Sequence, residues 1–200
     1  MVKRGFDLVM SGVGLLLSAP IWALIALAIK IEDGGPVFFR QRRVGRRGTS
    51  FIAYKFRSMI PEAAWAPPLQ AIKGDPRVTR VGAVLRPTAF DELPQLWNIF
   101  KGDMSFVGPR PLMPGEIEVR GDGLNVPLDA IPGYDARHAV TPGLTGLAQI
   151  YAPRDVRRAA KFRLDRLYAR RANFWLDLKL IAVSFWISAR GRWEHRASKL

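Results

Sequence analysis

The sequence predicts an α+β fold: one mostly helical domain that carries a small β-hairpin or sheet, a re-entrant membrane helix at its N-terminal end and interfacial amphipathic helices. A length of 200 residues is typical of a single domain and is enough to bury a core. An uncharged run covers residues 8–29. Helical patterns cover residues 156–168 and 174–188, and short strand-like runs lie between them and the uncharged run.

The charge, cysteine and histidine content of the chain indicates which partners and metal sites to expect. A net charge of +14 favours an anionic partner such as nucleic acid, anionic lipid or a phosphorylated substrate. The chain has no cysteine, which excludes a disulfide framework and a thiolate metal site and fits a reducing cytoplasm. His138 and His195 lie too far apart in the sequence to form a zinc constellation, and we interpret both as surface residues.

The uncharged run at residues 8–29 would reach about 33 Å as a helix, enough to cross the hydrocarbon core of a bilayer. Pro20 lies near its middle, shortly after Ser18, and an interior proline kinks a helix. Basic residues stand on both sides of the run: Lys3, Arg4, Lys30, Arg40, Arg42 and Arg43. Because basic flanks favour the cytoplasmic side, the run is compatible with a re-entrant helix that bends at Ser18 and Pro20. A spanning helix is an equal alternative, and a buried soluble helix is less favoured.

Residues 37–39 and 51–54 read as two strands around the loop at residues 44–48, which predicts a β-hairpin. Five cations gather in this part of the chain: Arg40, Arg42, Arg43, Arg46 and Arg47. Near an anionic leaflet each could contribute about 1 kcal/mol. For Arg46 and Arg47 we favour a solvated loop.

The segment after the hairpin adds two further cations. Lys55 and Arg57 fall on one side of a strand, with Phe56 on the other. Residues 61–68 are predicted to form an irregular loop or a short helix, and residues 74–82 are rich in turn-forming residues and mixed in charge.

Two adjacent carboxylates, Asp91 and Glu92, follow Arg86 at the start of a predicted helix. The apolar positions of that helix recur at helical spacing: Leu93, Leu96, Trp97 and Phe100. Pro94 fits only the first turn, so Asp91 is predicted at or beside the N-cap. A helix N-terminus favours anions, so both carboxylates should be ionised and able to attack a polarised centre or bind a hard cation. Simple helix capping is the alternative.

Downstream, Pro109 and Pro111 fix the backbone around Arg110, which suits a guanidinium that must point at a phosphate. A structural bridge from Arg110 to a carboxylate is equally compatible. Residues 115–132 are predicted to form a segment of helix and loop. Residues 141–150 pair a tight turn with a strand-like run, whose glycines allow close approach to a ligand or simply make a turn.

The C-terminal part predicts two helices. The helix at residues 156–168 has a basic face opposite its apolar one. The helix at residues 174–188 would reach about 22 Å, too short to span a bilayer. Trp175, Phe185 and Trp186 suit an interfacial position, and packing into the core is nearly as favoured. The expected organisation is thus a membrane helix with its flanks (1–33), a catalytic domain with interfacial helices (34–189) and a basic tail (190–200).

Seven motifs follow one another in order: Lys3–Asp7, Pro36–Gln41, Lys55–Met59, Asp75–Thr79, Asp91–Asn98, Val107–Pro111 and Pro142–Gln149. Together with Asp165, Tyr168 and Asp177, this series resembles the bacterial sugar transferase family, the monotopic phosphoglycosyl transferases. Each motif alone is a weak signal, but their order and spacing from about Lys3 to Lys179 make the resemblance specific.

The resemblance implies an enzyme on the cytoplasmic face of a bacterial inner membrane. It would transfer a sugar 1-phosphate from a UDP-sugar to polyprenyl (undecaprenyl) phosphate and release UMP, as the first membrane step of glycan assembly. Asp91 would be the nucleophile that forms a covalent phosphosugar intermediate. Glu92 would hold Mg²⁺ or assist proton transfer, with both carboxylates as metal ligands. Substrate and phosphate binding would fall to Lys55, Arg57, Asp75, Arg86, Arg110, Thr145 and Gln149.

The sequence departs from the family pattern at three places. Ala19 stands where a serine often precedes the membrane proline, Thr141 replaces a basic residue, and Tyr151–Arg154 replaces an Asn-Gly-Arg run. The identity of the sugar is therefore not carried over. An inactive membrane-attached scaffold of the same fold is the alternative function. Nucleic-acid binding is disfavoured by the uncharged run, an anionic phospholipid membrane is the expected surface, and a homodimer stays open.

Overall fold

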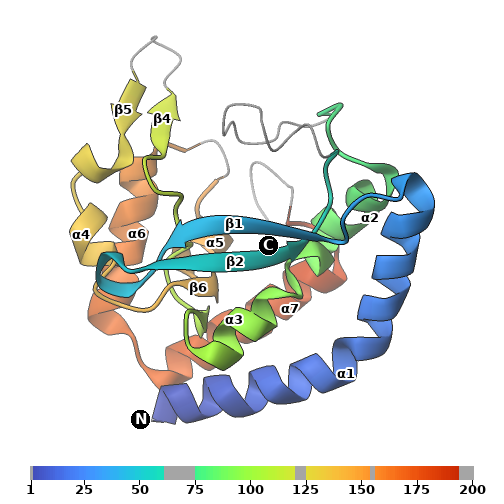
Figure 1. Cartoon of the computed structure of the whole chain (residues 1–200). Helices are drawn as coiled ribbons and strands as arrows, with labels where there is room; N and C mark the ends of the chain where they lie inside the picture. The colour runs from blue at the N-terminus through green and yellow to red at the C-terminus, as the bar shows by residue number, and fades with distance from the viewer. Residues whose placement is uncertain (1, 61–74, 120–124, 154–155, 194–200) are drawn as a thin grey trace.

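The computed structural model describes residues 2–60, 75–119, 125–153 and 156–193. Helices and small sheets form one body, with α1 wrapped along two of its sides (Figure 1). In chain order the elements are α1 (Val2–Asp33), β1 (Phe38–Val44), η1 (Arg46–Gly48), β2 (Ser50–Phe56), α2 (Arg80–Thr88), η3 (Phe90–Glu92), α3 (Gln95–Lys101), β3 (Ser105–Val107), β4 (Ile117–Val119), β5 (Asn125–Pro127), η4 (Leu128–Ala130), α4 (Tyr134–Arg137), β6 (Gly143–Thr145), α5 (Leu147–Tyr151), α6 (Arg158–Arg171) and α7 (Phe174–Ala189). The predicted α+β class with a predominance of helix is confirmed.

Helix α1 is the only helix in the described part of the chain that is long and apolar enough to cross a membrane. Pro20 lies inside it, and the helix bends near its middle (Figure 1). The Ser18 hydroxyl donates to the carbonyl of Leu15 at 3.5 Å, a long contact. Large apolar side chains on its outer side are exposed, for example Leu16 and Leu17. Such an uncovered apolar surface indicates association with a membrane.

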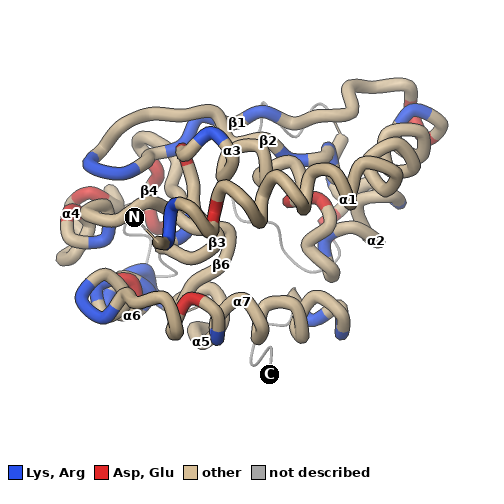
Figure 2. The backbone as a smooth tube through the Cα atoms, turned by 90° about the horizontal axis from the view of Figure 1, so that it is seen from below, with Lys and Arg blue, Asp and Glu red and all other residues tan. Residues whose placement is uncertain are grey.

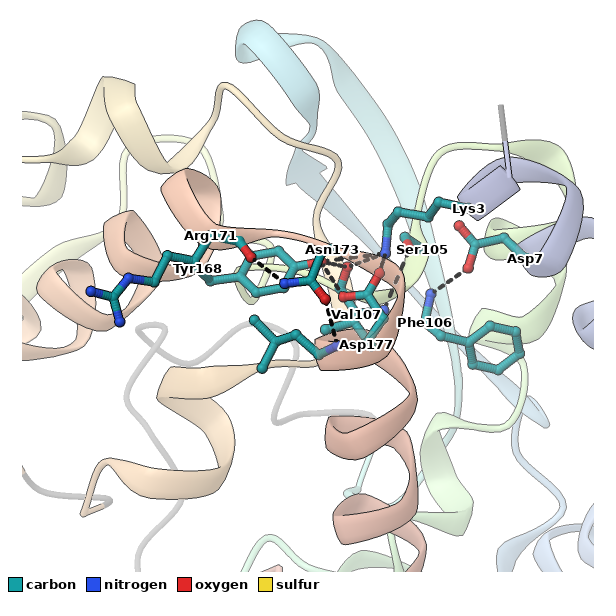
Figure 3. Close-up of polar contacts among 10 residues, drawn as sticks. Lys3, Asp7, Ser105, Phe106, Val107, Tyr168, Arg171, Asn173 and Asp177 are labelled. Atoms are coloured by element: carbon teal, nitrogen blue, oxygen red, sulfur yellow. Dashed lines mark hydrogen bonds and ion pairs between the residues drawn. The ribbon is translucent and has the colours of Figure 1, made fainter.

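The first turns of α1 are bonded to the body of the protein. The Lys3 ammonium donates to the carboxylate of Asp177 at 2.5 Å and to the carbonyl of Val107 at 3.1 Å, and the hydroxyl of Tyr168 lies 2.7 Å from Asp177 Oδ1 (Figure 3). The carboxylate of Asp7 accepts from the amide of Phe106. These bonds join α1 to β3, α6 and α7.

Strands β1 and β2 form the predicted hairpin, paired antiparallel from Phe38 opposite Phe56 to Val44 opposite Ser50. Strand β1 is longer than predicted because it continues through the arginines, of which Arg40 and Arg42 lie on one face and Arg43 on the other. The amide of Val44 also donates to the carbonyl of Leu112 at 2.8 Å. The hairpin is therefore attached to the loop that follows Arg110.

Two further strand pairs were not predicted. Strands β3 and β6 pair in parallel, and Gly108 lies against the backbone of Thr141, where a Cβ would come within 2.3 Å of the carbonyl oxygen. Strands β4 and β5 form an antiparallel hairpin. The helical interpretation of residues 115–132 is therefore wrong, apart from the short η4 turn. Pro127 ends β5 in a three-residue edge pair, a position that tolerates its missing N–H.

The helices of the C-terminal part match their predictions closely. Helix α6 runs from Arg158 to Arg171 and α7 from Phe174 to Ala189, with Asn173 capping α7 through a bond from the amide of Leu176. Along α7, Leu180 and Ile187 are buried, whereas its aromatic residues Trp175, Phe185 and Trp186 are exposed. One side of α7 thus packs into the core and the other is uncovered. Lysine and arginine residues gather on α6 and on the hairpin, whereas most of α1 is uncharged (Figure 2).

Four local predictions need correction or lie outside the described residues. The turn-rich segment ends in α2, which Thr79 caps by accepting from the amide of Gly82. His138 is buried against the ring of Tyr134, and burial together with the charge of Arg137 lowers its pKa to about 4. Its interpretation as a surface residue is therefore wrong. The predictions for residues 61–68 and for His195 fall outside the described ranges.

Candidate active site

The acidic pair lies in a short turn between two helices. Ala89 has a φ of 60°, a left-handed conformation that ends α2 and turns the chain into η3, which contains Asp91 and Glu92. Helix α3 begins only at Gln95, with Pro94 at its N-cap. Asp91 is therefore not the N-cap of α3, and the predicted start of this helix is wrong by one turn. The left-handed conformation of Ala89 places the short helix η3 before Pro94, and the sequence pattern does not reveal this conformation.

Glu92 is the charged centre of the site. Its Oε1 accepts from the Lys55 ammonium and lies 3.3 Å from Nη2 of Arg110. Burial opposes its ionisation, but the charges of Lys55 and Arg110 together outweigh burial and lower the pKa of Glu92. Glu92 is therefore an anion held between two cations from distant parts of the chain.

Asp91 has a different environment, although it is the neighbouring residue. Its side chain is buried, and burial followed by the nearby charge of Glu92 raises its pKa, against the attraction of Lys55, Arg86 and Arg110 (which lower it). In the described part of the chain, no side chain forms an ion pair with Asp91. The pair thus consists of Glu92, which two cations neutralise, and Asp91, which forms no salt bridge with any described residue.

Asn98 places Lys55 opposite Glu92. The buried carboxamide of Asn98 accepts from the amide of Tyr54 at 3.1 Å and donates to the carbonyl of Ile52 at 2.6 Å. These two bonds attach strand β2 to helix α3, so the strand that carries Lys55 is fixed against the helix that follows Glu92. This role of Asn98 could not be predicted from the sequence, because a single polar residue gives no periodic signal.

Arg137 places Arg110. The guanidinium of Arg137 donates to the main-chain carbonyl of Arg110 at 2.6 Å and to the carboxylate of Asp165 at 2.8 Å. Arg137 and Asp165 are almost fully buried, with 2% and 3% of their surfaces exposed. This buried ion pair fixes the loop from which the Arg110 side chain reaches Glu92. In the sequence, Asp165 stands out only as part of a family motif, and no pattern points to Arg137.

A small cavity lies beside Glu92, between the hairpin and the loop around Arg110. The residues that line it are Arg43, Ala53, Lys55, Glu92, Gln95, Arg110, Pro111, Gly143 and Leu144. Arg43, which the sequence analysis interpreted as a cation for the lipid leaflet, therefore faces the site instead. Its neighbour Arg42 is exposed on the opposite face of β1.

Of the predicted site residues, Asp91, Glu92, Lys55, Arg86 and Arg110 come together, with Arg86 close enough to lower the pKa of Asp91. The others have partners elsewhere: Arg57 binds the Asp33 carboxylate and the carbonyl of Pro36, Asp75 pairs with Arg77, Thr145 lies 2.5 Å from the Ser184 hydroxyl, and Gln149 donates to the carbonyl of Gly143 at 3.4 Å. Their roles in substrate binding stay predictions.

The acidic pair fits the ligand chemistry of magnesium. Mg²⁺ is usually bound through one or two carboxylates together with substrate phosphates and water, and it does not need a cage of protein ligands. Asp91 and Glu92 supply two adjacent carboxylates. No group of three or more histidine, aspartate or glutamate side chains arranged for a metal occurs in the described part of the chain, so Mg²⁺ would depend on this pair and on a bound phosphate.

Comparison with known proteins gives the family. The model of the family described as "Bacterial sugar transferase" matches residues 1–191. The chain is 44% identical to the undecaprenyl-phosphate glucose phosphotransferase of Komagataeibacter xylinus, over 91% of this chain and 35% of that protein. It is 42% identical to the UDP-glucose:undecaprenyl-phosphate glucose-1-phosphate transferase of Klebsiella pneumoniae, over 91% and 39%.

A third relative has a length closer to that of this chain. The exopolysaccharide production protein ExoY of Rhizobium meliloti is 39% identical over 90% of this chain and 82% of its own length. The chain thus spans little more than a third of the two named phosphotransferases but most of ExoY. Because the family model covers nearly the whole chain, this protein belongs to the bacterial sugar transferase family.

Proposed function

We propose that this protein transfers a sugar 1-phosphate from a UDP-sugar to polyprenyl phosphate and releases UMP. The observation that carries the proposal is the acidic pair, in which Lys55 and Arg110 hold Glu92 and leave Asp91 without a salt-bridge partner among the described residues. The names of two relatives specify undecaprenyl phosphate as the acceptor of a sugar phosphate. The complete acidic pair and its cations argue against an inactive scaffold.

The reaction would proceed in two displacements. A carboxylate oxygen of Asp91 attacks the β-phosphorus of the UDP-sugar, the bond to the bridging oxygen breaks, and UMP leaves with the bonding electron pair. A phosphate oxygen of the polyprenyl phosphate then attacks the phosphorus of the aspartyl-phosphosugar, which regenerates the Asp91 carboxylate. Lys55, Arg86 and Arg110 stabilise the negative charge that develops on the phosphoryl oxygens. Glu92 serves as a metal ligand or as a proton acceptor.

Mg²⁺ held by Asp91, Glu92 and the substrate phosphates would supply further neutralisation of the diphosphate. The cluster brings Lys55, Arg86 and Arg110 to the acidic pair, which suits a substrate with two adjacent phosphoryl groups. Such a site favours the transition state over the free substrate when its charges are already in place before the reaction.

We also propose that α1 is re-entrant and that both of its ends lie on the cytoplasmic side of the membrane. The bend near Pro20, the basic residues on both flanks and the exposed apolar outer side of α1 support this arrangement. The exposed aromatic residues of α7 would lie at the same interface. A soluble nucleotide sugar and a lipid phosphate would then reach the site from the same surface.

Cysteine labelling tests the topology, because the chain has no cysteine of its own. Val2→Cys and Ile31→Cys introduce a thiol near each end of α1, at positions whose side chains are exposed. In intact cells, a membrane-impermeant thiol reagent should label neither variant, and permeabilisation should allow labelling of both. Labelling of either variant in intact cells would contradict a re-entrant helix, since a spanning helix exposes one end.

Replacing Arg110 with Ala should reduce kcat/KM by about 10²–10³-fold, which corresponds to about 2.7–4 kcal/mol of lost charge stabilisation by analogy with oxyanion donors. The bond from Arg137 to the carbonyl of residue 110 involves only the main chain and is retained. Turnover is measured as UMP release, with Arg42→Ala as a matched control on an exposed position. A folded Arg110→Ala variant with normal turnover would leave Arg110 only the structural role of a salt bridge.

A further inference from the structure

Arg43 is a cation of the active-site cavity that the mechanism above does not use. Strand β1 alternates, so Arg42 faces solvent and Arg43 faces the cavity beside Lys55 and Arg110. The guanidinium of Arg43 donates to the side-chain carbonyl of Gln41 and to the main-chain carbonyl of Pro111 at 3.3 Å. Both acceptors are neutral, so they orient the guanidinium without neutralising it.

The lining of the cavity contains more cations than carboxylates. Among the described residues that line it, Arg43, Lys55 and Arg110 are cations, and Glu92 is the only carboxylate. Glu92 Oε1 already accepts from both Lys55 and Arg110. No carboxylate of the described chain forms an ion pair with Arg43. Burial, followed by repulsion from Arg110, lowers the pKa of Arg43 to about 10. The carboxylates of Glu116 and Glu92 attract Arg43 from a distance, but neither forms an ion pair with it, so its guanidinium has no bonded counter-ion among the described residues.

We propose that Arg43 is a donor-binding residue whose guanidinium binds the diphosphate group of the nucleotide sugar, between strand β1 and the loop that carries Arg110. This inference rests on the proposed function and deepens it. A phosphate bound at the mouth of this small cavity would give Arg43 the bonded counter-ion that it lacks among the described residues. A guanidinium has five N–H donors in a planar fork, so donors beyond those bound to Gln41 and Pro111 are left for phosphoryl oxygens.

The lack of a bonded counter-ion also predicts how Arg43 affects stability. A half-buried cation next to Arg110 that forms no ion pair with a described carboxylate is unfavourable in the unliganded protein. Its replacement by a neutral residue should therefore leave the Tm of the ligand-free protein unchanged or raise it. A purely structural arginine would give the opposite sign, because its removal lowers the Tm. Binding and stability thus separate the two roles.

The test uses the full chain in detergent with inorganic pyrophosphate as the probe, and it compares Arg43→Gln with Arg42→Gln. The two substitutions remove the same charge from adjacent positions on opposite faces of β1. Arg43→Gln should weaken pyrophosphate binding about tenfold or more, as expected for the loss of a charged hydrogen bond, and should raise the KM for UDP-sugar in parallel. Arg42→Gln should stay within about twofold of the unmodified protein. Arg43→Lys, which keeps the charge without the fork, should give intermediate affinity.

Equal pyrophosphate affinities for Arg43→Gln and Arg42→Gln would overturn the inference, as would a failure of the unmodified protein to bind pyrophosphate. If Arg43→Gln does not fold, the Arg43→Lys variant decides: affinity equal to that of the unmodified protein would overturn the inference, and reduced affinity at unchanged Tm would support it. The proposed function fails differently, since pyrophosphate would then bind through Arg43 although no UMP is released from any UDP-sugar.

Discussion

Asp91→Asn should abolish the release of UMP from UDP-sugar, with a loss of turnover on the order of 10⁴-fold or more, as expected when a covalent nucleophile is removed. The substitution keeps the size of the side chain and removes its charge. Because Asp91 has no salt-bridge partner in the described part of the chain, neutralising this carboxylate breaks no ion pair among the described residues. The variant should therefore keep its fold and its association with the membrane fraction.

The unmodified enzyme should release one burst of UMP when it is mixed with a UDP-sugar in the absence of polyprenyl phosphate. Steady-state kinetics should be ping-pong. Intact mass spectrometry should detect the addition of one sugar phosphate, and digestion should map it to the peptide that contains Asp91. Glu92→Gln is the matched comparison, since it also neutralises one carboxylate of the pair and should slow the reaction without removing the nucleophile. Ternary-complex kinetics without an adduct on Asp91 would contradict the two-step mechanism. Both carboxylates would then be metal ligands, and the lipid phosphate would attack the UDP-sugar directly.

Asp165→Asn should destabilise the protein by about 3–5 kcal/mol, because it leaves the buried guanidinium of Arg137 without a counter-ion. The free energy of unfolding is measured by denaturant titration in detergent. Asp135→Asn is the matched control, because it removes a carboxylate from an exposed position of α4, the helix that also contains Arg137. The control should change stability by less than about 0.5 kcal/mol.

Asp165→Asn should also lower catalytic activity, because Asp165 orients Arg137 and Arg137 donates to the main-chain carbonyl of Arg110. The activity loss should appear in kcat/KM at temperatures where the variant is still folded, and it should not add fully to the effect of Arg110→Ala in the double variant. A loss of stability below about 1 kcal/mol, with unchanged kcat/KM, would show that the buried pair neither stabilises the fold nor positions Arg110.

The elements that the sequence revealed are those with a long pattern. The uncharged run predicted α1, with Pro20 near its middle, and the opposed basic and apolar faces predicted α6. The two short apolar runs predicted the β1–β2 hairpin. Strands β3 and β6 have three residues each, which is too short for an alternating pattern, and their pairing depends on contacts about 40 residues apart in the sequence. Helix α2 contains Gly82 and Pro87, which obscure a helical signal.

The candidate site shows the same division. Asp91, Glu92, Lys55 and Arg110, which the structure brings together, were predicted because charged residues of the right types stand in distinctive motifs. Asn98 and Arg137 were missed because their function is to bond distant backbone groups, which no local pattern encodes. Arg43 was assigned to the lipid surface because charge alone does not reveal that the strand alternates and turns this side chain inward.

The contacts of Lys3 have a consequence for attempts to obtain a soluble fragment. Removal of residues 1–33 would delete the cation that lies 2.5 Å from Asp177, a carboxylate whose side chain is only 5% exposed. It would also remove Arg4, which donates to the carbonyls of Ile99 and Phe100 at the end of α3. The truncated chain would expose the apolar side of α3, which packs against α1. It would also leave the buried carboxylate of Asp177, next to β3, without its cation. Helix α1 thus stabilises the rest of the domain through these contacts. We therefore expect a folded sample from the full chain in detergent or nanodiscs, and not from a truncated chain.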